Sequence, residues 1–282
     1  MKTIVFVADL FINEYIGGAE LTTEAIVNKC AAKYKVIKKQ CKELTKHFVL
    51  QNKDAKFVIC NFSSLSDEKK ILLCKNVNYH IIEYDYKFCK YRSQEKHYAI
   101  EGKHCECIKG GKGKINKIFY GYANKIWFMS KKQKNIFLKN VSTIKEKKCE
   151  VLSSVFSDGD LRFIESIKNN KKNQKYLILN SNSWIKNTKG CVEYAKDNNM
   201  SYELIQGLPY HEMLIKMSTS RGLIFRPLGG DTCPRVVIEA MMLGCEVEAN
   251  DNVQHKDESW FSNEEECYKY MSSRAKYFME NV

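Results

Sequence analysis

The sequence predicts an α/β protein made of two successive domains, each with a parallel sheet. Short apolar runs that suit buried strands alternate with segments of helical periodicity, and this alternation is typical of βαβ units. A polar stretch at 168–175 interrupts the alternation, which then restarts. With 282 residues, 44% of them hydrophobic, the chain is long enough for two small domains that each bury a core.

Buried strands are expected at five places in the first half. They cover residues 3–8, 57–61, 79–83, 125–129 and 149–152, and helices are expected over 17–33, 67–75, 116–123 and 131–138. Residues 85–113 are polar, aromatic and irregular. They run into a glycine-rich basic stretch, 109–114, that is expected to be a flexible loop.

The second half repeats the pattern. Strands are expected over 176–179, 202–205, 222–225 and 245–249, with helices over 190–198 and 209–217 between them. A final amphipathic helix over 264–280 places Tyr268, Met271, Ala275 and Phe278 on one face. We therefore expect a first domain at 1–155, a second domain at 156–262 and a C-terminal helix at 263–282 that can cross back to the first domain.

The chain is basic, with a net charge of +13. One interpretation is attraction to an anionic surface or polymer, such as nucleic acid, anionic lipid or an acidic glycan. However, nearly all the basic residues are lysines spread along the chain, and a general bias toward Lys, Asn and Ile explains them as well. Arginine, which binds phosphates and base edges better than lysine does, is scarce.

The expected compartment is the cytoplasm. The N-terminal apolar run ends at Asp9, which suits a first strand better than a signal peptide. No apolar run approaches the roughly 20 residues of a membrane span. The 12 cysteines are scattered, as buried free thiols are in a reducing compartment. Peripheral attachment to a membrane remains open.

The only dense group of metal-ligand residue types is Cys105-Glu-Cys107, with His104 beside it and Cys89 and His97 upstream. A Cys-x-Cys pair lacks the paired Cys-x2-Cys spacing of common structural zinc sites. We therefore assign no metal from the sequence.

The most informative motif lies at 225–247. A glycine pair, 229–230, follows an expected strand, and Asp231, Thr232 and Pro234 are residue types that begin helices. Apolar residues then recur at helical spacing until Gly244. A helix N-terminus that follows a glycine loop favours the binding of an anion, usually a phosphate. Asp231 and Glu239, eight positions apart, bracket that start.

This acid-x7-acid spacing, with Ala240 after the second acid and Gly244 beyond it, resembles the nucleotide-sugar site of retaining glycosyltransferases of family 4, which have the GT-B fold. The resemblance implies two facing Rossmann-like βαβ domains with a central cleft, the first on the acceptor side and the second holding the donor. It implies an enzyme that moves a hexose from a UDP- or GDP-sugar, with retention, to a glycan, a lipid-linked glycan or a modified nucleic acid. The donor is a substrate, and no cofactor or metal is expected.

The resemblance also implies roles for residues of the motif. Glu239 would hold the ribose hydroxyls of the donor. Asp231 would lie by the donor sugar, where the family usually has the longer Glu. The backbone at Thr232 and Cys233, together with Arg235, would meet the diphosphate.

Two further segments resemble diphosphate contacts of the family. Gly17-Gly18, with Ala19 and Glu20, would face the diphosphate or the acceptor, although a glycine pair is also typical of a plain tight turn. The family carries an Arg and, five residues later, a Lys before Gly. Lys189 matches the Lys, but Trp184 stands where the Arg would be, so Lys186 is the candidate substitute, with Arg226 or Arg235 as further candidates.

The remaining candidates are Gly207 and Leu208 at the nucleobase, and Asp85 and Arg92 at the acceptor. For the first pair the alternative is a strand-to-helix turn, and for the second a structural salt bridge. Tyr84 occupies the place where the family often has a His. Because of these departures, a catalytically degenerate nucleotide-binding module is the rival interpretation. The sugar, the base, the acceptor and the oligomeric state are left open by the sequence.

Overall fold

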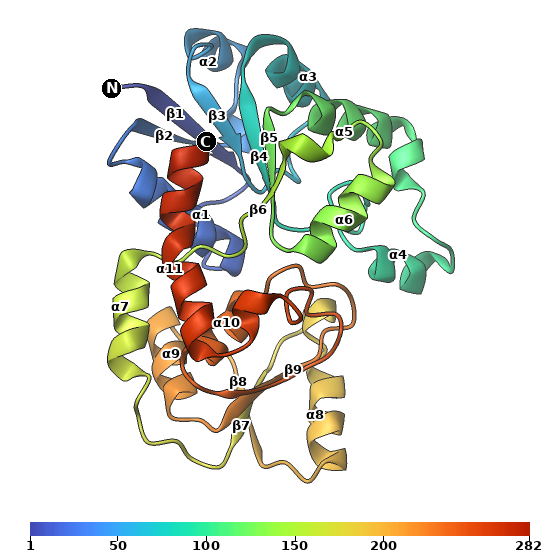
Figure 1. Ribbon diagram of the computed structural model, residues 1–282. Coiled ribbons are helices and arrows are strands. Elements are labelled where there is room, and N and C mark those ends of the chain that lie inside the picture. Colours follow the sequence, from blue (N-terminus) through green and yellow to red (C-terminus); the bar gives the residue numbers. More distant parts are fainter. The chain divides into compact units, whose positions relative to one another are not determined.

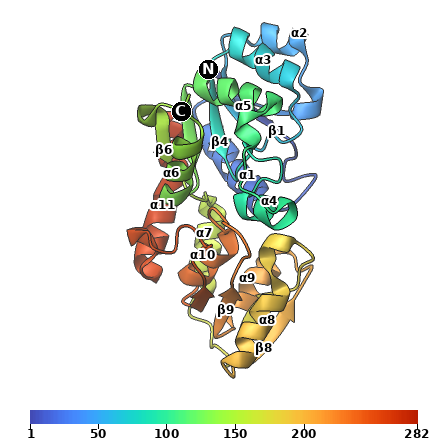
Figure 2. The same cartoon turned by 90° about the vertical axis from the view of Figure 1, so that its right-hand side faces the viewer.

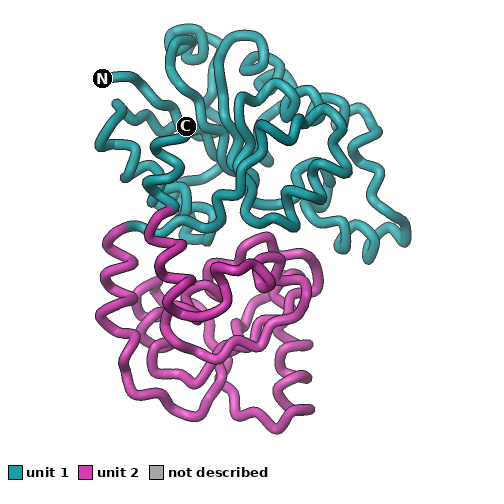
Figure 3. The backbone as a smooth tube through the Cα atoms, in the orientation of Figure 1, with its two compact units in different colours: residues 1–157, 274–282 teal, residues 158–273 magenta. Residues whose placement is uncertain are grey.

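The structure is a computed structural model that describes residues 1–282, apart from the side chain of Lys112. The chain divides into two compact units (Figure 3). Unit 1 comprises Met1–Ser157 together with Arg274–Val282, and unit 2 comprises Asp158–Ser273. In the described chain, no helix combines the length and apolar character needed to cross a membrane.

Unit 1 is built on a six-stranded parallel sheet with the order β2-β1-β3-β4-β5-β6 (Figure 1). Its strands are β1 (Thr3–Ala8), β2 (Lys35–Gln40), β3 (Lys56–Ile59), β4 (Tyr79–Glu83), β5 (Lys125–Phe128) and β6 (Cys149–Val151). Residues of β1, β3, β4 and β5 are almost all buried, as expected for central strands covered on both faces.

The helices of unit 1 follow the strands in turn. They are α1 (Gly18–Cys30), α2 (Lys46–Gln51), α3 (Asp67–Asn76), α4 (Gln94–Glu101), α5 (Gly111–Tyr122), α6 (Lys131–Asn140) and the last part of α11 (Glu264–Asn281). Because parallel crossovers are right-handed, the reversal of strand order after β1 places α1 on one face of the sheet and α2, α3 and α5 on the other. Figure 2 shows α3 and α5 side by side.

The sequence predictions for unit 1 missed three elements and placed one boundary wrongly. Helix α2 was not predicted, and α4 lies within residues 85–113, which were expected to be irregular. Strand β2 was not predicted because it carries lysines where a buried strand carries apolar residues. Its place at the edge of the sheet accounts for this pattern, since lysines there discourage pairing with another chain. The basic stretch at 109–114 is not a loop throughout, because α5 already begins at Gly111.

An aromatic cluster forms much of the core of unit 1. The ring of Phe137 on α6 packs against Tyr86, Phe88, Tyr120 and Phe128, with centroid distances of 5.0–5.8 Å. The first two of these residues lie beyond the end of β4, so the start of the irregular segment after β4 is anchored in the core.

The end of α11 packs on unit 1. The guanidinium of Arg274 donates to the carbonyl oxygens of Val151 and Leu152, each at 2.9 Å. The rings of Phe278 and Trp127 lie 5.0 Å apart. Met271, Ala275 and Phe278 of the expected apolar face are all buried.

Unit 2 is built on a four-stranded parallel sheet with the order β10-β9-β7-β8. Its strands are β7 (Tyr176–Leu179), β8 (Tyr202–Ile205), β9 (Gly222–Phe225) and β10 (Glu246–Ala249), and its helices are α7 (Asp158–Ile167), α8 (Thr188–Asp197), α9 (Tyr210–Ser218), α10 (Arg235–Met242) and the first part of α11. These strands agree with the sequence predictions within a residue.

Helix α10 begins later than its capping signals suggest. Its N-cap is Pro234, and no side chain caps it. The predicted stop is confirmed, since Gly244 has a φ of +64°, a left-handed conformation that favours glycine.

Candidate functional site

The strand order of unit 2 creates a topological switch point between β7 and β9. The connections after these two strands leave in opposite directions, and ligands of open α/β sheets bind at the carboxyl ends of strands at such points. The two loops are joined there. The amide of Asn187 donates to the carbonyl of Arg226 at 2.8 Å, and the backbone N–H of Leu228 donates to the carbonyl of Ile185 at 3.3 Å.

Two of the predicted donor-site residues meet at this point. Lys186, after β7, places its Nζ 3.2 Å from Oδ2 of Asp231, after β9. The same ammonium group lies 4.8 Å from the centroid of the Phe225 ring. Both side chains are only partly buried, so the pair joins a cation and a carboxylate that a polar ligand can still reach.

Asp231 is held by the neighbouring loop after β10. Its backbone N–H donates to the carbonyl of Asn252 at 2.8 Å, and its own carbonyl accepts from Gln254 at 3.0 Å. The side-chain amides of Asn250 and Asn252 both donate to the carbonyl of Pro227. These bonds fix the glycine loop that carries Asp231, although the loop has no regular structure.

A buried polar network surrounds the second acid of the motif. Arg235 donates through Nε to Glu239 at 2.8 Å, and through Nη2 to Tyr210 at 2.9 Å and to Asp160 at 3.1 Å. The hydroxyl of Tyr210 lies 2.9 Å from the same Glu239 oxygen. The side chains of Arg235 and Glu239 are only 3% and 5% exposed. Glu239 is therefore paired in this structure.

Burial dominates the titration of this network. It raises the pKa of Glu239, and the guanidinium of Arg235 offsets the rise only in part. Burial also raises the pKa of Tyr210, which stays a neutral phenol. A ligand hydroxyl that replaced Tyr210 at Glu239 would keep the carboxylate hydrogen-bonded, so the network is compatible with a ribose contact.

The other predicted residues of unit 2 lie as follows. Lys189, in the first turn of α8, has a side chain that is 90% exposed and lies 3.8 Å from Glu193, so it does not join Lys186 and Asp231. Gly207 has a φ of +68° in the turn after β8, and Leu208 beside it is exposed. Thr232 and Cys233 are buried before α10.

Neither further arginine candidate stands beside Lys186. The guanidinium of Arg226 stacks on the ring of Tyr194 at 4.0 Å, and Arg235 is held by Glu239 and Asp160. Sequence reasoning missed Asp160 and Tyr210 as members of the network. Asp160 lies in the first turn of α7, and only its contact with Arg235, across 75 positions of the chain, identifies it as part of the network.

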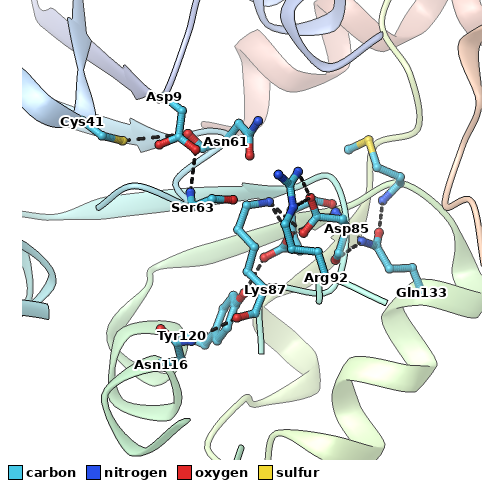
Figure 4. Close-up of polar contacts among 12 residues, drawn as sticks. Asp9, Cys41, Asn61, Ser63, Asp85, Lys87, Arg92, Asn116, Tyr120 and Gln133 are labelled. Carbon is cyan, nitrogen blue, oxygen red and sulfur yellow. Dashed lines mark hydrogen bonds and ion pairs between the residues drawn. The ribbon is translucent and has the colours of Figure 1, made fainter. Parts of the chain in front are cut away.

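The switch point of unit 1 lies between β1 and β3. The carboxylate of Asp9, after β1, accepts from the backbone N–H groups of Ser63 and Ser64 at 2.7 and 3.0 Å (Figure 4). Gly17 is the N-cap of α1, and a Cβ there would lie 2.7 Å from the Glu20 carboxylate. This crowding is with side chains and favours a small residue whether or not a ligand binds, so the role of Gly17-Gly18 at a ligand stays a prediction.

The predicted acceptor-side residues Asp85 and Arg92 form an ion pair beyond the end of β4 (Figure 4). Nε of Arg92 donates to Asp85 at 2.7 Å, and the φ of Arg92 is +58°. Lys87 lies between Asp85 and Glu83, donating at 3.1 and 2.9 Å. Tyr120 also donates to Glu83. Sequence reasoning missed Lys87, although acids at alternate positions before it were a signal.

Charge and burial compete in this cluster. Burial alone would raise the pKa of Asp85, but Lys87 and Arg92 outweigh it and hold that pKa below its usual value. Burial likewise would lower the pKa of Lys87, and Asp85 and Glu83 raise it instead. Lys87 is 4% exposed and Arg92 is 46% exposed. Of these two cations, Arg92 is the one open to a ligand.

A pocket of about 520 Å³ adjoins this cluster within unit 1. Its lining includes the cations Lys70, Lys87, Lys90 and Arg92, the acids Asp67 and Glu68, and the polar side chains of Ser64 and Asn116. A concave site with convergent cations and hydrogen-bonding side chains is suited to a polar or anionic ligand.

Comparison with solved structures identifies the fold. Sucrose-phosphate synthase from Thermosynechococcus elongatus is similar with a TM-score of 0.67 at 9% sequence identity, covering 100% of this chain and 97% of that chain. AviGT4, a glycosyltransferase involved in avilamycin A biosynthesis, has a TM-score of 0.60 at 7% identity, covering 99% and 96%. UDP-GlcNAc 2-epimerase from Neisseria meningitidis, solved with UDP-GlcNAc bound, has a TM-score of 0.54 at 11% identity, covering 99% of each chain.

No protein-family model matches the chain, and no curated protein is significantly similar to it in sequence. The two parallel-sheet units and the structural matches across the chain show that this protein has the GT-B fold, with two Rossmann-like domains. The predicted fold class is therefore confirmed.

Proposed function

We propose that this protein is a glycosyltransferase whose unit 2 binds a nucleoside diphosphate sugar. The observation that carries the proposal is the meeting of Lys186 and Asp231 at the switch point, beside the helix that bears Arg235 and Glu239. A cation and a helix start suit a diphosphate, and carboxylates accept hydrogen bonds from sugar and ribose hydroxyls. The structurally similar proteins support it, since they include a sugar-phosphate synthase, a glycosyltransferase and an epimerase bound to UDP-GlcNAc.

In this proposal the donor is a UDP- or GDP-hexose. Glu239 accepts hydrogen bonds from the ribose hydroxyls, and Asp231 orients the hexose. Lys186 and the N-terminal end of α10 contact the diphosphate. Gly207 and Leu208 lie at the base, and the exposed Lys189 contacts the donor only if its side chain turns from Glu193.

The proposed reaction breaks the bond between the anomeric carbon and the diphosphate oxygen and forms a bond from that carbon to an acceptor oxygen. Negative charge grows on the departing diphosphate, and Lys186 with the α10 helix start stabilises it. The acceptor proton passes to the departing diphosphate, so no protein base is required. This chemistry, with retention, is what the resemblance to family 4 implies.

We assign the acceptor to unit 1, at the pocket beside Arg92. The half-exposed guanidinium of Arg92 and the neighbouring lysines suit an anionic acceptor, such as an acidic glycan, a lipid-linked phosphate or a modified nucleic acid. Gel shifts with duplex DNA over a salt series separate these classes. Binding that weakens steeply with salt favours nucleic acid as the acceptor, and absence of a shift excludes it.

One observation favours the rival function, a nucleotide-binding module without turnover. Glu239 is already bonded to Arg235 and Tyr210, and the exposed Lys189 leaves Lys186 as the one lysine that contacts Asp231 within the described side chains. Such a module would bind a nucleoside diphosphate but would not release one from a sugar donor.

The deciding experiment is donor turnover. The purified protein is incubated with UDP- and GDP-hexoses, and release of nucleoside diphosphate and free sugar is followed by chromatography. Slow hydrolysis of one donor, lost in Asp231→Asn but kept in Asp197→Asn at the exposed end of α8, supports the transferase. Nucleotide binding without release from any donor supports the module instead.

A further inference from the structure

Four metal-ligand side chains from separate parts of the sequence meet in unit 1. Cys89 lies in the loop after β4, His97 on α4, and Cys105 and Cys107 in the segment between α4 and α5. One ligand atom from each lies within 4.8 Å of all the others. Cys89 and His97 are buried, and the other two are half-buried.

The distances in this cluster match a tetrahedral site. Nδ1 of His97 lies 3.7 Å from Sγ of Cys89 and 3.6 Å from Sγ of Cys107. With Zn–S bonds of about 2.3 Å and Zn–N bonds of about 2.0–2.1 Å, the sulfur–nitrogen edge of a zinc tetrahedron is roughly 3.5–3.6 Å. The observed separations therefore leave room for one ion between the ligands.

We propose that Cys89, His97, Cys105 and Cys107 bind one zinc ion as a structural Cys3His site. Thiolate and imidazole are the ligands that zinc takes in tetrahedral structural sites. Because four protein ligands fill the coordination shell, no position remains for water or substrate. The site therefore orders the chain and does not itself perform catalysis.

The spacing explains why the sequence did not predict this site. Seven residues separate Cys89 from His97, seven separate His97 from Cys105, and one separates the last two cysteines. No Cys-x2-Cys knuckle occurs among these four. Helix α4 has its C-cap at Gly102, which has a left-handed φ of +66°, and the chain then brings Cys107 close to His97, whose Nδ1 already lies near Cys89.

A crosslink would add order to the segment that carries these ligands. Tyr86 and Phe88 anchor its start in the core, but residues 84–110 as a whole hold only one short helix and a 3-10 turn, and connections of this length with so little secondary structure are uncommon in compact domains. The segment is closely packed where it meets α5. A Cβ on Gly113 would lie 2.2 Å from the carbonyl oxygen of Cys107, so the two backbones touch at this glycine.

The zinc site would also shape the pocket of unit 1. Cys89 and Cys107 both line that pocket. The backbone N–H of Arg92 donates to the carbonyl of Cys89 at 3.0 Å, and Arg92 holds a left-handed φ. Zinc at Cys89 therefore fixes the turn that presents Arg92 to Asp85. This consequence holds whichever ligand the pocket takes.

The experiment measures metal directly in the whole protein. The chain is purified under reducing conditions, freed of loosely bound metal by gel filtration, and analysed for metals by mass spectrometry. The proposal expects one zinc per chain, released on modification of the thiols by a mercurial. It also expects cobalt(II) to bind in its place, with the visible absorption bands of a tetrahedral thiolate complex.

Matched variants locate the ion. Cys105→Ser and His97→Ala should bind zinc at least tenfold more weakly, whereas Cys74→Ser and His104→Ala, which change residues outside the cluster, should keep one zinc per chain. Alkylation of the native protein followed by mass spectrometry distinguishes free thiols from a disulfide among the three cysteines.

Several outcomes would overturn the site. The wild-type protein could take up no zinc after reduction and addition of the ion, it could hold a disulfide among these cysteines, or it could bind a different metal. Zinc retained at full stoichiometry by both cluster variants would also overturn it. If the variants fail to fold, the metal content of the wild-type protein still decides.

Discussion

Lys186 and Asp231 lie 45 positions apart in the chain, yet the ammonium nitrogen of one is 3.2 Å from a carboxylate oxygen of the other. Strands β7 and β9, which precede them, are neighbours in the sheet, so their carboxyl ends bring the two loops together. The pair therefore follows from the topology of unit 2, and it joins the two groups that the proposed donor site needs most.

Replacing Lys186 tests the charge assigned to it. Lys186→Met should lower turnover of a sugar donor by roughly a hundredfold, because a group that stabilises charge in the transition state contributes about 3 kcal/mol. Lys216→Met, at a partly exposed pair with Glu203, is the matched control and should leave turnover within twofold. Steady-state kinetics of diphosphate release measures both. An unchanged rate in a folded Lys186→Met protein would remove this residue from the reaction.

Replacing Glu239 tests the ribose contact. Glu239→Ala should weaken donor binding by about 2 kcal/mol, the scale of a lost hydrogen bond to a charged group. Arg235 keeps Asp160 as a partner in this variant, which limits the damage to the fold. Calorimetric titration with the nucleoside diphosphate gives the affinity. Equal affinities in wild type and a folded variant would disprove the ribose role.

Lys87 and Arg92 should behave differently, although both contact Asp85. Lys87→Met leaves the buried Glu83 carboxylate without its cation, removes one of the two cations at Asp85, and should lower the free energy of unfolding by about 3–5 kcal/mol. Arg92→Gln removes a half-exposed partner and should cost about 1 kcal/mol or less. Urea unfolding of both variants measures the contrast. If the two losses were equal, the assignment of Lys87 as the structural cation would fail.

The buried His255 should make the folding stability of unit 2 decrease in acid. Burial lowers the pKa of this histidine from its usual 6.5 to about 3. The unfolded chain takes up the proton near pH 6.5 and the folded chain does not, so the stabilisation is present above pH 6.5 and is lost as pH falls. Between pH 7 and pH 5 the loss is about 2 kcal/mol.

The variant His255→Phe should remove most of this loss. His255 is fully buried and its ring stacks on Trp260. The aromatic ring of phenylalanine can take the place of the imidazole there. His47→Phe, at an exposed position, is the control and should keep the wild-type pH dependence. Urea unfolding at the two pH values measures the difference. The same decline from pH 7 to pH 5 in His255→Phe would assign it to other groups.

Most of the fold was predictable because its strands are buried on both faces. Continuous apolar runs mark β1, β7 and β9, and glycine marks the end of α10. Strand β2 escaped prediction because an edge strand needs no apolar run. Its lysines discourage pairing with another chain, and they also interrupt the apolar pattern by which a strand is predicted.

The candidate site was predictable only where its residues follow strands. The loops after β7 and β9 carry recognisable motifs, so Lys186, Asp231 and Glu239 could be named. Asp160 and Tyr210 could not, since they join Arg235 only through the packing of α7 on α9 and of α9 on α10. The sequence showed Cys89, His97, Cys105 and Cys107 as a group of metal-ligand types but gave no reason to assign a metal, because their spacing matches no common zinc motif and only the fold brings the four together.

The most direct test of the donor-site proposal is a thermal-shift screen of the purified protein with UDP, GDP, ADP, TDP and CMP, run in parallel on Glu239→Ala. A ligand at 100 times its Kd stabilises the folded state by about 2.7 kcal/mol, which raises Tm by several degrees. We predict a rise with UDP or GDP, a smaller rise in the variant at the same concentration, and none with CMP. No rise with any diphosphate at millimolar concentration would contradict a nucleotide-sugar site in unit 2.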